Sequence, residues 1–265
     1  MSKLMTILSP AKTMDMDVAD SPVDSSRPRL GTNTKQLAEE LRGYSAKKLG
    51  SLMSISDKLA LLNEDRWQTF GEKSNPRGPA AICFRGDVYQ GLEAWSLDKR
   101  SLSWAQDHVR ILSGLYGLLR PMDVIQPYRL EMGTRLKTDS GSNLYDFWGD
   151  SITKTLKKDL AAVKATTLVN LASDEYAKAL QLDKLGVDVI NVKFLQKDAG
   201  REKFISFFAK RARGLMARWM STDRPSKPAD LSGFNLEGYR IKKSASSENE
   251  LVFVRPKPAA KKKAS

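Results

Sequence analysis

Short apolar runs alternate with stretches of helical spacing along this 265-residue chain, and this alternation is the feature that most constrains its fold. Leu4 to Leu8 is an apolar run that enters a polar loop at Ser9, and such runs are typical of buried strands. Further strands are predicted over residues 80–84, 166–171, 187–194 and 251–254. Helical spacing or a capping residue predicts helices over residues 34–41 and 54–70, from 101 or 103 to about 112, and after residues 151 and 173.

This order of elements predicts an α/β (α+β) fold, with a mixed β-sheet flanked by helices. No internal repeat and no long polar linker interrupts the chain, so residues 1–254 are expected to form a single domain. Residues 255–265, rich in Pro, Ala and Lys, are expected to be a disordered basic tail. The segment from Met14 to Gly31 contains four aspartates and is expected to be a surface loop. Its carboxylates would suit Mg²⁺ or Ca²⁺, but a solvated loop is the interpretation we favour.

Cys83 is the only cysteine and His108 the only histidine, and these two counts exclude several classes of chemistry. No internal disulfide can form, and no zinc or iron site can be built from Cys and His within one chain. Cys83 lies in an apolar run, where a thiol has a raised pKa and is inert. His108 lies in a predicted helix beside Asp107 and Arg110, where we expect a structural role. No metal and no cofactor are expected.

The net charge of +13 predicts a polyanionic partner or a basic surface patch. The tail contributes +5 through Arg255, Lys257 and the lysines at 261–263, so the rest of the chain still carries +8. No apolar run approaches the ~18 residues that a membrane span needs, and the first ten residues lack the pattern of a signal sequence. We therefore expect a cytoplasmic protein with no membrane partner.

Three of the predicted strands lead directly into compact polar motifs. Ser9–Thr13 has the sequence SPAKT, Arg85–Tyr89 has RGDVY, and Ala172–Tyr176 has ASDEY. Ligand sites in open sheets gather at such strand ends, where Lys12 can neutralise an anion and a carboxylate such as Asp87 can act as acid or base. The alternative is structural, because serines and acidic residues at these positions also stabilise helix N-termini.

The sequence LSGLYG, from Leu112 to Gly117, follows an amphipathic stretch and matches the hairpin of a helix-hairpin-helix element. Gly114 and Gly117 would permit a tight turn and a close approach of backbone. A hairpin of this kind presents backbone N–H groups to a DNA phosphate and reads no base. An ordinary glycine-rich turn between packed helices is the alternative, and Pro121 would keep the second helix short.

The stretch from Lys203 to Met220 separates into a basic and an apolar side on a helical wheel. The apolar side holds Phe204, Ile205, Phe208, Leu215, Met216 and Trp219. The basic side holds Lys203, Lys210, Arg211, Arg213 and Arg218. Nucleic-acid phosphate is its simplest partner, while a solvated face and an anionic membrane surface are the alternatives. Residues 204–208 can also form a strand, which leaves the basic side intact.

Several longer strings occur in order along the chain: LSPAKT, FRGDVYQGL, LSGLYGLLRP, QPYRLEMG, LYDFWGD, NLASDEY and FAKRARGLMAR between Leu8 and Arg218, then LSGFNLEGY over Leu231 to Tyr239. They resemble the bacterial YaaA family over nearly the whole chain. The resemblance implies a single-domain α/β fold with a helix-hairpin-helix element. It also implies protection from hydrogen peroxide, linked to lower free iron and less oxidative DNA damage, and binding of duplex or branched DNA through a positively charged cleft.

Two hypotheses about function follow. In the first, the protein binds double-stranded or branched DNA, with no obligate protein partner, through Gly114, Leu115, Tyr116, Gly117, Arg120, Lys210, Arg211, Arg213 and Arg218. In the second, it is an enzyme acting on a nucleotide or nucleobase in a pocket made by Lys12, Arg85, Asp87, Arg120, Arg129, Glu131, Asp146, Asp174 and Glu175. The candidate catalytic residues are Lys12, Asp87, Glu131 and Asp174. Convergence of these charges in one concave pocket would favour the enzyme.

Overall fold

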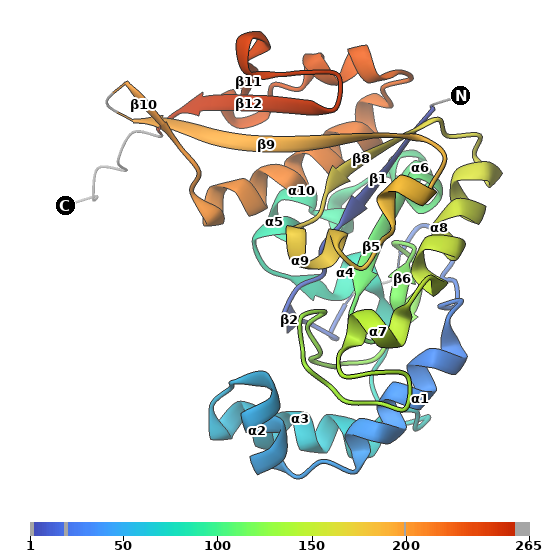
Figure 1. Cartoon of the computed structure of the whole chain (residues 1–265). Coiled ribbons are helices and arrows are strands. Elements are labelled where there is room, and N and C mark those ends of the chain that lie inside the picture. Colours follow the sequence, from blue (N-terminus) through green and yellow to red (C-terminus); the bar gives the residue numbers. More distant parts are fainter. Residues whose placement is uncertain (1–2, 19–20, 199, 258–265) are drawn as a thin grey trace.

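The computed structural model describes residues 3–18, 21–198 and 200–257, and its centre is an eight-stranded mixed β-sheet (Figure 1). The order along the sheet is β11-β12-β9-β8-β1-β5-β6, and β10 pairs with β9. The central pairings are parallel, while β6, β10 and β11 run antiparallel to their neighbours, which confirms the predicted fold class. The strands are β1 (Leu4–Leu8), β5 (Val109–Ser113), β6 (Gly117–Leu119), β8 (Thr167–Leu171), β9 (Asp188–Asp198), β10 (Arg201–Lys203), β11 (Arg240–Ile241) and β12 (Glu250–Pro256).

Strand β1 lies inside the sheet and is buried along its whole length. It pairs in parallel with β5 on one side and with β8 on the other. The chain therefore builds the sheet outward from β1 in one direction, and then crosses to the other side of β1 for β8 and β9. Open sheets that reverse direction in this way leave a crevice beyond the carboxyl ends of the strands at the reversal.

Helices surround the sheet, and those at its carboxyl-end crevice matter most for function. Helices α5 and α10 pack on each other, and α6 and α10 contact β1 (Figure 1). The first three helices form a separate layer below the sheet in the view of Figure 1. The helices are α1 (Gly31–Arg42), α2 (Ala46–Met53), α3 (Asp57–Thr69), α4 (Ala80–Cys83), α5 (Asp87–Leu92), α6 (Lys99–His108), α7 (Leu144–Trp148), α8 (Ser151–Ala162), α9 (Asp174–Ala177) and α10 (Ser206–Asp223).

Two pairs of two-residue strands lie outside the main sheet, β2 (Thr13–Met14) with β4 (Phe84–Arg85) and β3 (Gly78–Pro79) with β7 (Val124–Ile125). Short 3₁₀ turns complete the secondary structure at Ala94–Ser96, Leu182–Lys184, Pro228–Gly233, Leu236–Gly238 and Lys243–Ala245. Within the described residues, no helix is long and apolar enough to cross a bilayer.

The strand predicted over residues 80–84 is wrong, because residues 80–83 form the one-turn helix α4. The amides of Ala80 and Ala81 bond to the carbonyls of Asp123 and Pro121, which holds the start of this turn against a distant loop. A short buried apolar run is compatible with either structure, and periodicity cannot separate the two. Of the five residues predicted to form this strand, Phe84 alone lies in one, as the first residue of β4.

The helix predicted to reach residue 112 ends earlier, at His108, and β5 begins at Val109. The sequence LSGLYG is therefore the turn of a β-hairpin, in which Ser113 pairs with Gly117. The helix-hairpin-helix prediction is wrong, because pairing with β1 draws residues 109–111 into the sheet. Every residue of β5 is buried, and a fully buried strand does not show the alternating pattern of an exposed one. The sequence of β5 was therefore predicted as the end of a helix.

Other boundaries shift by a few residues. The helix predicted over 54–70 begins at Asp57, and α2 before it was not predicted. In the basic stretch, residues 201–203 form β10 and the helix begins at Ser206. Arg255 belongs to β12, so the predicted tail begins too early, and residues 258–265 lie outside the described residues. The predictions of helix α1 and of strands β1, β8, β9 and β12 are confirmed within a few residues.

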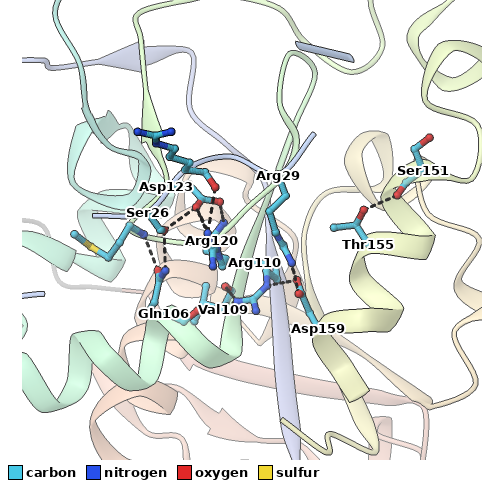
Figure 2. A network of polar contacts seen from close by, with 12 residues as sticks. Ser26, Arg29, Gln106, Val109, Arg110, Arg120, Asp123, Ser151, Thr155 and Asp159 are labelled. Atoms are coloured by element: carbon cyan, nitrogen blue, oxygen red, sulfur yellow. Dashed lines mark hydrogen bonds and ion pairs between the residues drawn. The ribbon is translucent and has the colours of Figure 1, made fainter. Parts of the chain in front are cut away.

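The predicted surface loop runs between β2 and α1 and contains no helix within its described residues. Figure 2 shows the polar network that fixes its end to the body of the molecule. Arg29 and the buried Arg110 both bind the carboxylate of Asp159 on α8, with 2.7 Å from Arg29 Nη2 and 2.5 Å from Arg110 Nε. Ser26 Oγ donates to the buried carboxylate of Asp123 at 2.7 Å. This network positions the chain that leads into α1.

Candidate functional site

A pocket of about 290 Å³ opens at the carboxyl ends of β1 and β8, where the topology predicts a crevice. The two strand ends are joined directly, because the Ser173 amide donates to Ser9 Oγ at 2.9 Å. Residues from five separate regions of the chain line it: Ser9, Pro10, Ala11, Lys12, Thr13, Arg85, Gly86, Asp87, Val88, Tyr89, Tyr128, Arg129, Leu130, Glu131, Ser173, Glu175, Tyr176, Lys210 and Arg213.

The lining is rich in charge and carries an excess of cations. It includes three carboxylates, those of Asp87, Glu131 and Glu175. It includes five cationic side chains, those of Lys12, Arg85, Arg129, Lys210 and Arg213. Three of these cations come from strand ends and loops, and two come from α10, so the combination arises only in the folded chain. Such a pocket suits an anionic ligand that also has polar groups for the carboxylates to recognise.

The crossing of α5 and α10 places the carboxylate of Asp87 and the guanidinium of Arg213 in the same pocket. A Cβ atom built on Gly214 would overlap the carbonyl oxygen of Val88. A Cβ atom on Gly91 would overlap the carbonyl oxygen of Arg211 in the same way. Glycine at both positions therefore lets the two helix backbones touch, which brings the first turn of α5 beside α10.

One ion cluster forms a wall of the pocket. Lys12 Nζ lies 2.5 Å from Glu131 Oε2, and Arg129 Nη2 lies 3.2 Å from Glu131 Oε1. The Nε atom of Arg129 is buried and has no hydrogen-bond partner among the described residues. Glu131 thus holds the side chains of Lys12 and Arg129 together at this wall of the pocket.

Arg85 approaches the pocket from a second side and is held in place by three kinds of contact. Its Nη2 atom lies 3.1 Å from Asp15 Oδ2, and its guanidinium carbon lies 4.6 Å from the ring centre of Trp95. Its Nη1 atom also donates to the carbonyl oxygen of Ile82. These contacts order the guanidinium, so little further side-chain entropy is lost when a ligand binds.

Three tyrosines make the inner surface. The Tyr89 hydroxyl donates to the carbonyl of Ser9 at 3.1 Å, and the Tyr128 hydroxyl lies 2.7 Å from Ser113 Oγ. Burial raises the pKa of Tyr89, Tyr128 and Tyr176 above the ordinary value for tyrosine. These hydroxyls are therefore neutral at physiological pH and serve as hydrogen-bonding and apolar walls, with no added negative charge.

Arg213 is the most unusual charge in the pocket. Its side chain is half-buried, and across the described part of the chain no hydrogen bond or ion pair holds it. Burial lowers the pKa of Arg213, and the charge of Asp174 acts in the opposite direction. A guanidinium stays charged in proteins even so. A half-buried cation without a partner indicates a place where an anionic ligand binds.

The structure brings most of the predicted enzyme pocket together. Lys12, Arg85, Asp87, Arg129, Glu131 and Glu175 line it. Three predicted members lie elsewhere. Arg120 binds Asp123, as Figure 2 shows. The carboxylate of Asp146 accepts from the side-chain amide of Asn143 at 2.8 Å, at the start of α7. Asp174 is exposed in the first turn of α9, which is the structural role weighed for it from the sequence.

The residues predicted to bind DNA lie in different surroundings, and those of the LSGLYG hairpin are buried. Leu115 and Tyr116 are buried, and a Cβ atom on Gly114 would overlap the carbonyl oxygen of Leu130. Gly117 is also buried, and a Cβ atom there would meet the ring of Trp148. The hairpin is therefore closed off by loop and side-chain atoms and presents no backbone face to a phosphate.

The cations of α10 have different surroundings. Arg211 Nη1 donates to the carbonyl of Gln90 at 2.9 Å, and Arg218 Nη1 donates to the carbonyl of Leu92 at 3.0 Å. These two arginines satisfy carbonyls at the end of α5, which have no partners within that helix. Lys210 and Arg213 are thus the members of the predicted basic side that line the pocket.

The lone cysteine and histidine lie outside the pocket lining. Burial raises the pKa of the Cys83 thiol to about 12, as the sequence predicts for an inert thiol. Burial lowers the pKa of His108, whose ring stacks on Trp104 and whose Nδ1 lies 2.8 Å from the carbonyl oxygen of Leu4. No cluster of three metal-ligating side chains occurs in residues 3–18, 21–198 and 200–257.

Sequence reasoning missed the serine pair that joins the strand ends, the tyrosine wall and the glycine contact between α5 and α10. The tyrosines gave no signal of their own, because aromatic residues are found in every buried region. The glycine contact did have a signal in the sequence. Small residues recur along one stretch of α10, at Ala209, Ala212, Gly214 and Ala217. Small side chains at such spacing are typical of closely packed helices.

Comparison with known proteins identifies the family. Residues 4–245 match the family described as peroxide stress protein YaaA. A UPF0246 protein of Phenylobacterium zucineum is 48% identical over 257 residues, which cover 96% of this chain and 96% of that protein. A UPF0246 protein of Idiomarina loihiensis is 48% identical over 255 residues, which cover 95% of this chain and 98% of that protein. A UPF0246 protein of Caulobacter vibrioides is 45% identical over 255 residues, which cover 96% of this chain and 100% of that protein. The match extends over the strands and helices that build the pocket, and the chain therefore belongs to the peroxide stress protein YaaA family.

Proposed function

We propose that this protein acts in the peroxide stress response by binding DNA, with a single nucleotide seated in the strand-end pocket. Family membership supports the peroxide stress role. The observation that carries the proposal is the half-buried guanidinium of Arg213, without a partner in the described chain, beside Lys210 in a pocket with excess positive charge. A nucleotide phosphate bound by these two side chains would supply the missing anion.

The size of the pocket supports binding of a single nucleotide and not of a whole duplex. Its volume of about 290 Å³ is close to the lower limit of small-molecule sites, which is about 300 Å³. A duplex is far too wide to enter, so a nucleotide from DNA must be at a strand end, in a single-stranded region, or turned out of the stack. Asp87 and Glu131 provide acceptors for the N–H groups of a base.

Removing both α10 cations of the pocket tests this proposal. For Lys210→Ala/Arg213→Ala, we expect weaker binding of labelled duplex and four-way-junction DNA by about tenfold or more per residue, because a hydrogen bond to a charged group contributes about 1.5–3 kcal/mol. The slope of log affinity against log salt concentration should decrease by about two, for two lost phosphate contacts. Fluorescence anisotropy at several salt concentrations measures both.

The matched control is Lys157→Ala/Lys158→Ala, which removes two exposed charges from α8 and leaves the same net charge. If the two double variants lose affinity equally, binding depends on net charge and not on the pocket. If the native protein binds DNA with no dependence on salt, the phosphate contacts proposed here do not exist.

A second candidate function is an enzyme that acts on a nucleotide or nucleobase, and the carboxylate of Asp87 favours it. No hydrogen bond or ion pair engages this carboxylate within the described ranges, although it lies in a pocket with five cations. An unengaged carboxylate beside a bound base can act as a general base toward water.

This candidate predicts release of free base from DNA that carries oxidised bases, detected by chromatography. Asp87→Asn should abolish the release while the same DNA still binds, because the amide keeps one oxygen that can accept from a base N–H and loses the basicity of the carboxylate. An absence of released base with the native protein, or equal release by Asp87→Asn, would remove the enzyme hypothesis and leave the binding proposal intact.

A further inference from the structure

An exposed apolar patch lies at the start of α10, next to the pocket. Phe204, Ile205 and Phe207 have 59%, 37% and 51% of their surfaces exposed. In Figure 1 this segment follows β10 and lies at the outer end of α10. Three large apolar side chains are thus exposed within four residues, and exposed apolar surface of this kind is a candidate interaction site.

The patch is continuous with the pocket along α10. Phe207, Lys210 and Arg213 follow one another at intervals of three residues, so their side chains form one ridge of the helix. Burial increases along this ridge, from the exposed Phe207 and Lys210 to the half-buried Arg213. An aromatic ring therefore stands at the outer end of a row whose two cations line the pocket.

The charge around the patch favours a polyanion. Arg201 and Lys203 on β10 are exposed and take part in no ion pair among the described residues. The acidic residue between them, Glu202, is bound by Lys242 at 2.8 Å. An aromatic ring set among unpaired cations is the combination that single-stranded nucleic acid uses, with bases stacked on rings and phosphates bound by cations.

We propose that Phe207 is a stacking platform for the base next to the nucleotide in the pocket, and that the protein thereby binds a single-stranded or splayed segment. This inference rests on the proposed function. Three residues of an α-helix rise about 4.5 Å, and stacked nucleotides are about 3.4 Å apart along a strand. One nucleotide can therefore stack on Phe207 while its neighbour reaches Lys210 and Arg213 in the pocket.

Two probes separate the platform from the pocket. Thymidine 5′-monophosphate occupies the pocket alone, whereas a 5′-phosphorylated (dT)₈ oligonucleotide extends beyond it. Phe207→Ala should weaken binding of (dT)₈ by about 5- to 150-fold, the range expected for loss of one base–aromatic stack. Binding of the mononucleotide, measured by calorimetry, should be unchanged. Phe207→Trp should keep the affinity for (dT)₈, and Phe207→Leu, which is apolar but cannot stack, should lose it.

The control is Leu61→Ala, which removes an apolar side chain that is 60% exposed on α3. Equal affinity of Phe207→Ala and Leu61→Ala for (dT)₈, or equal loss of the mononucleotide and the oligonucleotide in Phe207→Ala, would overturn the platform. Loss of binding to anionic phospholipid vesicles with unchanged (dT)₈ binding would overturn it in favour of a membrane surface. If the native protein binds neither nucleotide probe, the proposed function itself fails, and the platform with it.

Discussion

Gly214→Ala should destabilise the folded protein by about 3 kcal/mol or more, although alanine is the better helix former by about 1 kcal/mol. The reason is steric, because the new Cβ would overlap the carbonyl oxygen of Val88. The position of a Cβ atom is fixed by its own backbone and the carbonyl oxygen is a backbone atom, so neither can rotate away and α5 and α10 must separate. Separation would move Asp87 away from Arg213, and binding at the pocket should be lost together with stability. Urea unfolding followed by far-UV circular dichroism measures the first effect.

Gly50→Ala is the matched control, since Gly50 also lies inside a helix and its Cβ would make only an ordinary contact with Ala60. Helix propensity predicts that this variant is as stable as the native protein, or more stable by about 0.5–1 kcal/mol. A Gly214→Ala variant with native stability would show that the two helices can move apart freely. The close crossing would then not be what positions the pocket.

Asp159→Asn should cost about 3–5 kcal/mol, because it leaves the buried charge of Arg110 without its carboxylate. Asp159 is also the anchor for Arg29, so the chain that leads into α1 should loosen and become a site of proteolysis (Figure 2). Thermal unfolding and limited proteolysis measure the two effects. Asp150→Asn is the control: Asp150 pairs with Lys154 at the surface, where an ion pair contributes about 0.5 kcal/mol or less.

The stability lost in the Asp159→Asn variant should depend on pH. Burial pushes the pKa of Asp159 upward, but the hydrogen bonds and charges of Arg29 and Arg110 outweigh it and leave the pKa below its ordinary value. A carboxyl whose pKa is lower in the folded state stabilises the protein fully above its unfolded pKa, about 3.9. That stability disappears as the pH falls through the folded value. The native protein and Asp159→Asn should therefore differ most near neutral pH and converge in acid.

A double variant tests whether the stability lost in Asp159→Asn comes from the unpaired charge of Arg110 or from altered packing. Arg110→Met/Asp159→Leu removes both buried charges and should recover part of the stability that Asp159→Asn loses. If the double variant is less stable than Asp159→Asn, packing around these side chains matters more than the charge of Arg110.

The strand-end pocket was predictable to the extent that its chemistry is local. Lys12 and Glu175 each follow a strand of the main sheet within a few residues, and parallel strands bring their carboxyl ends to one edge of a sheet. Asp87 follows β4, which lies outside this sheet, so its place in the pocket depends on the packing of α5 on α10. Arg120 and Asp146 were assigned to the same pocket for their charge alone, and local partners three residues away bind them instead. Local pairing alone does not exclude a residue from the pocket, because Arg129 and Glu131 pair two residues apart and both line it.

The sequence by itself determined the family, the mixed sheet and the polar motifs at the strand ends, because apolar periodicity and residue order are properties of the chain. The tertiary structure alone decided that LSGLYG is a buried β-hairpin, since its conformation depends on pairing with β1, about a hundred residues earlier. It also decided which arginines of α10 are available. Arg211 and Arg218 are bound by carbonyls of α5, while Arg213 faces the pocket unbound within the described chain. Hydrogen-bond partners from distant segments exist only once the helices have packed, and no local pattern records them.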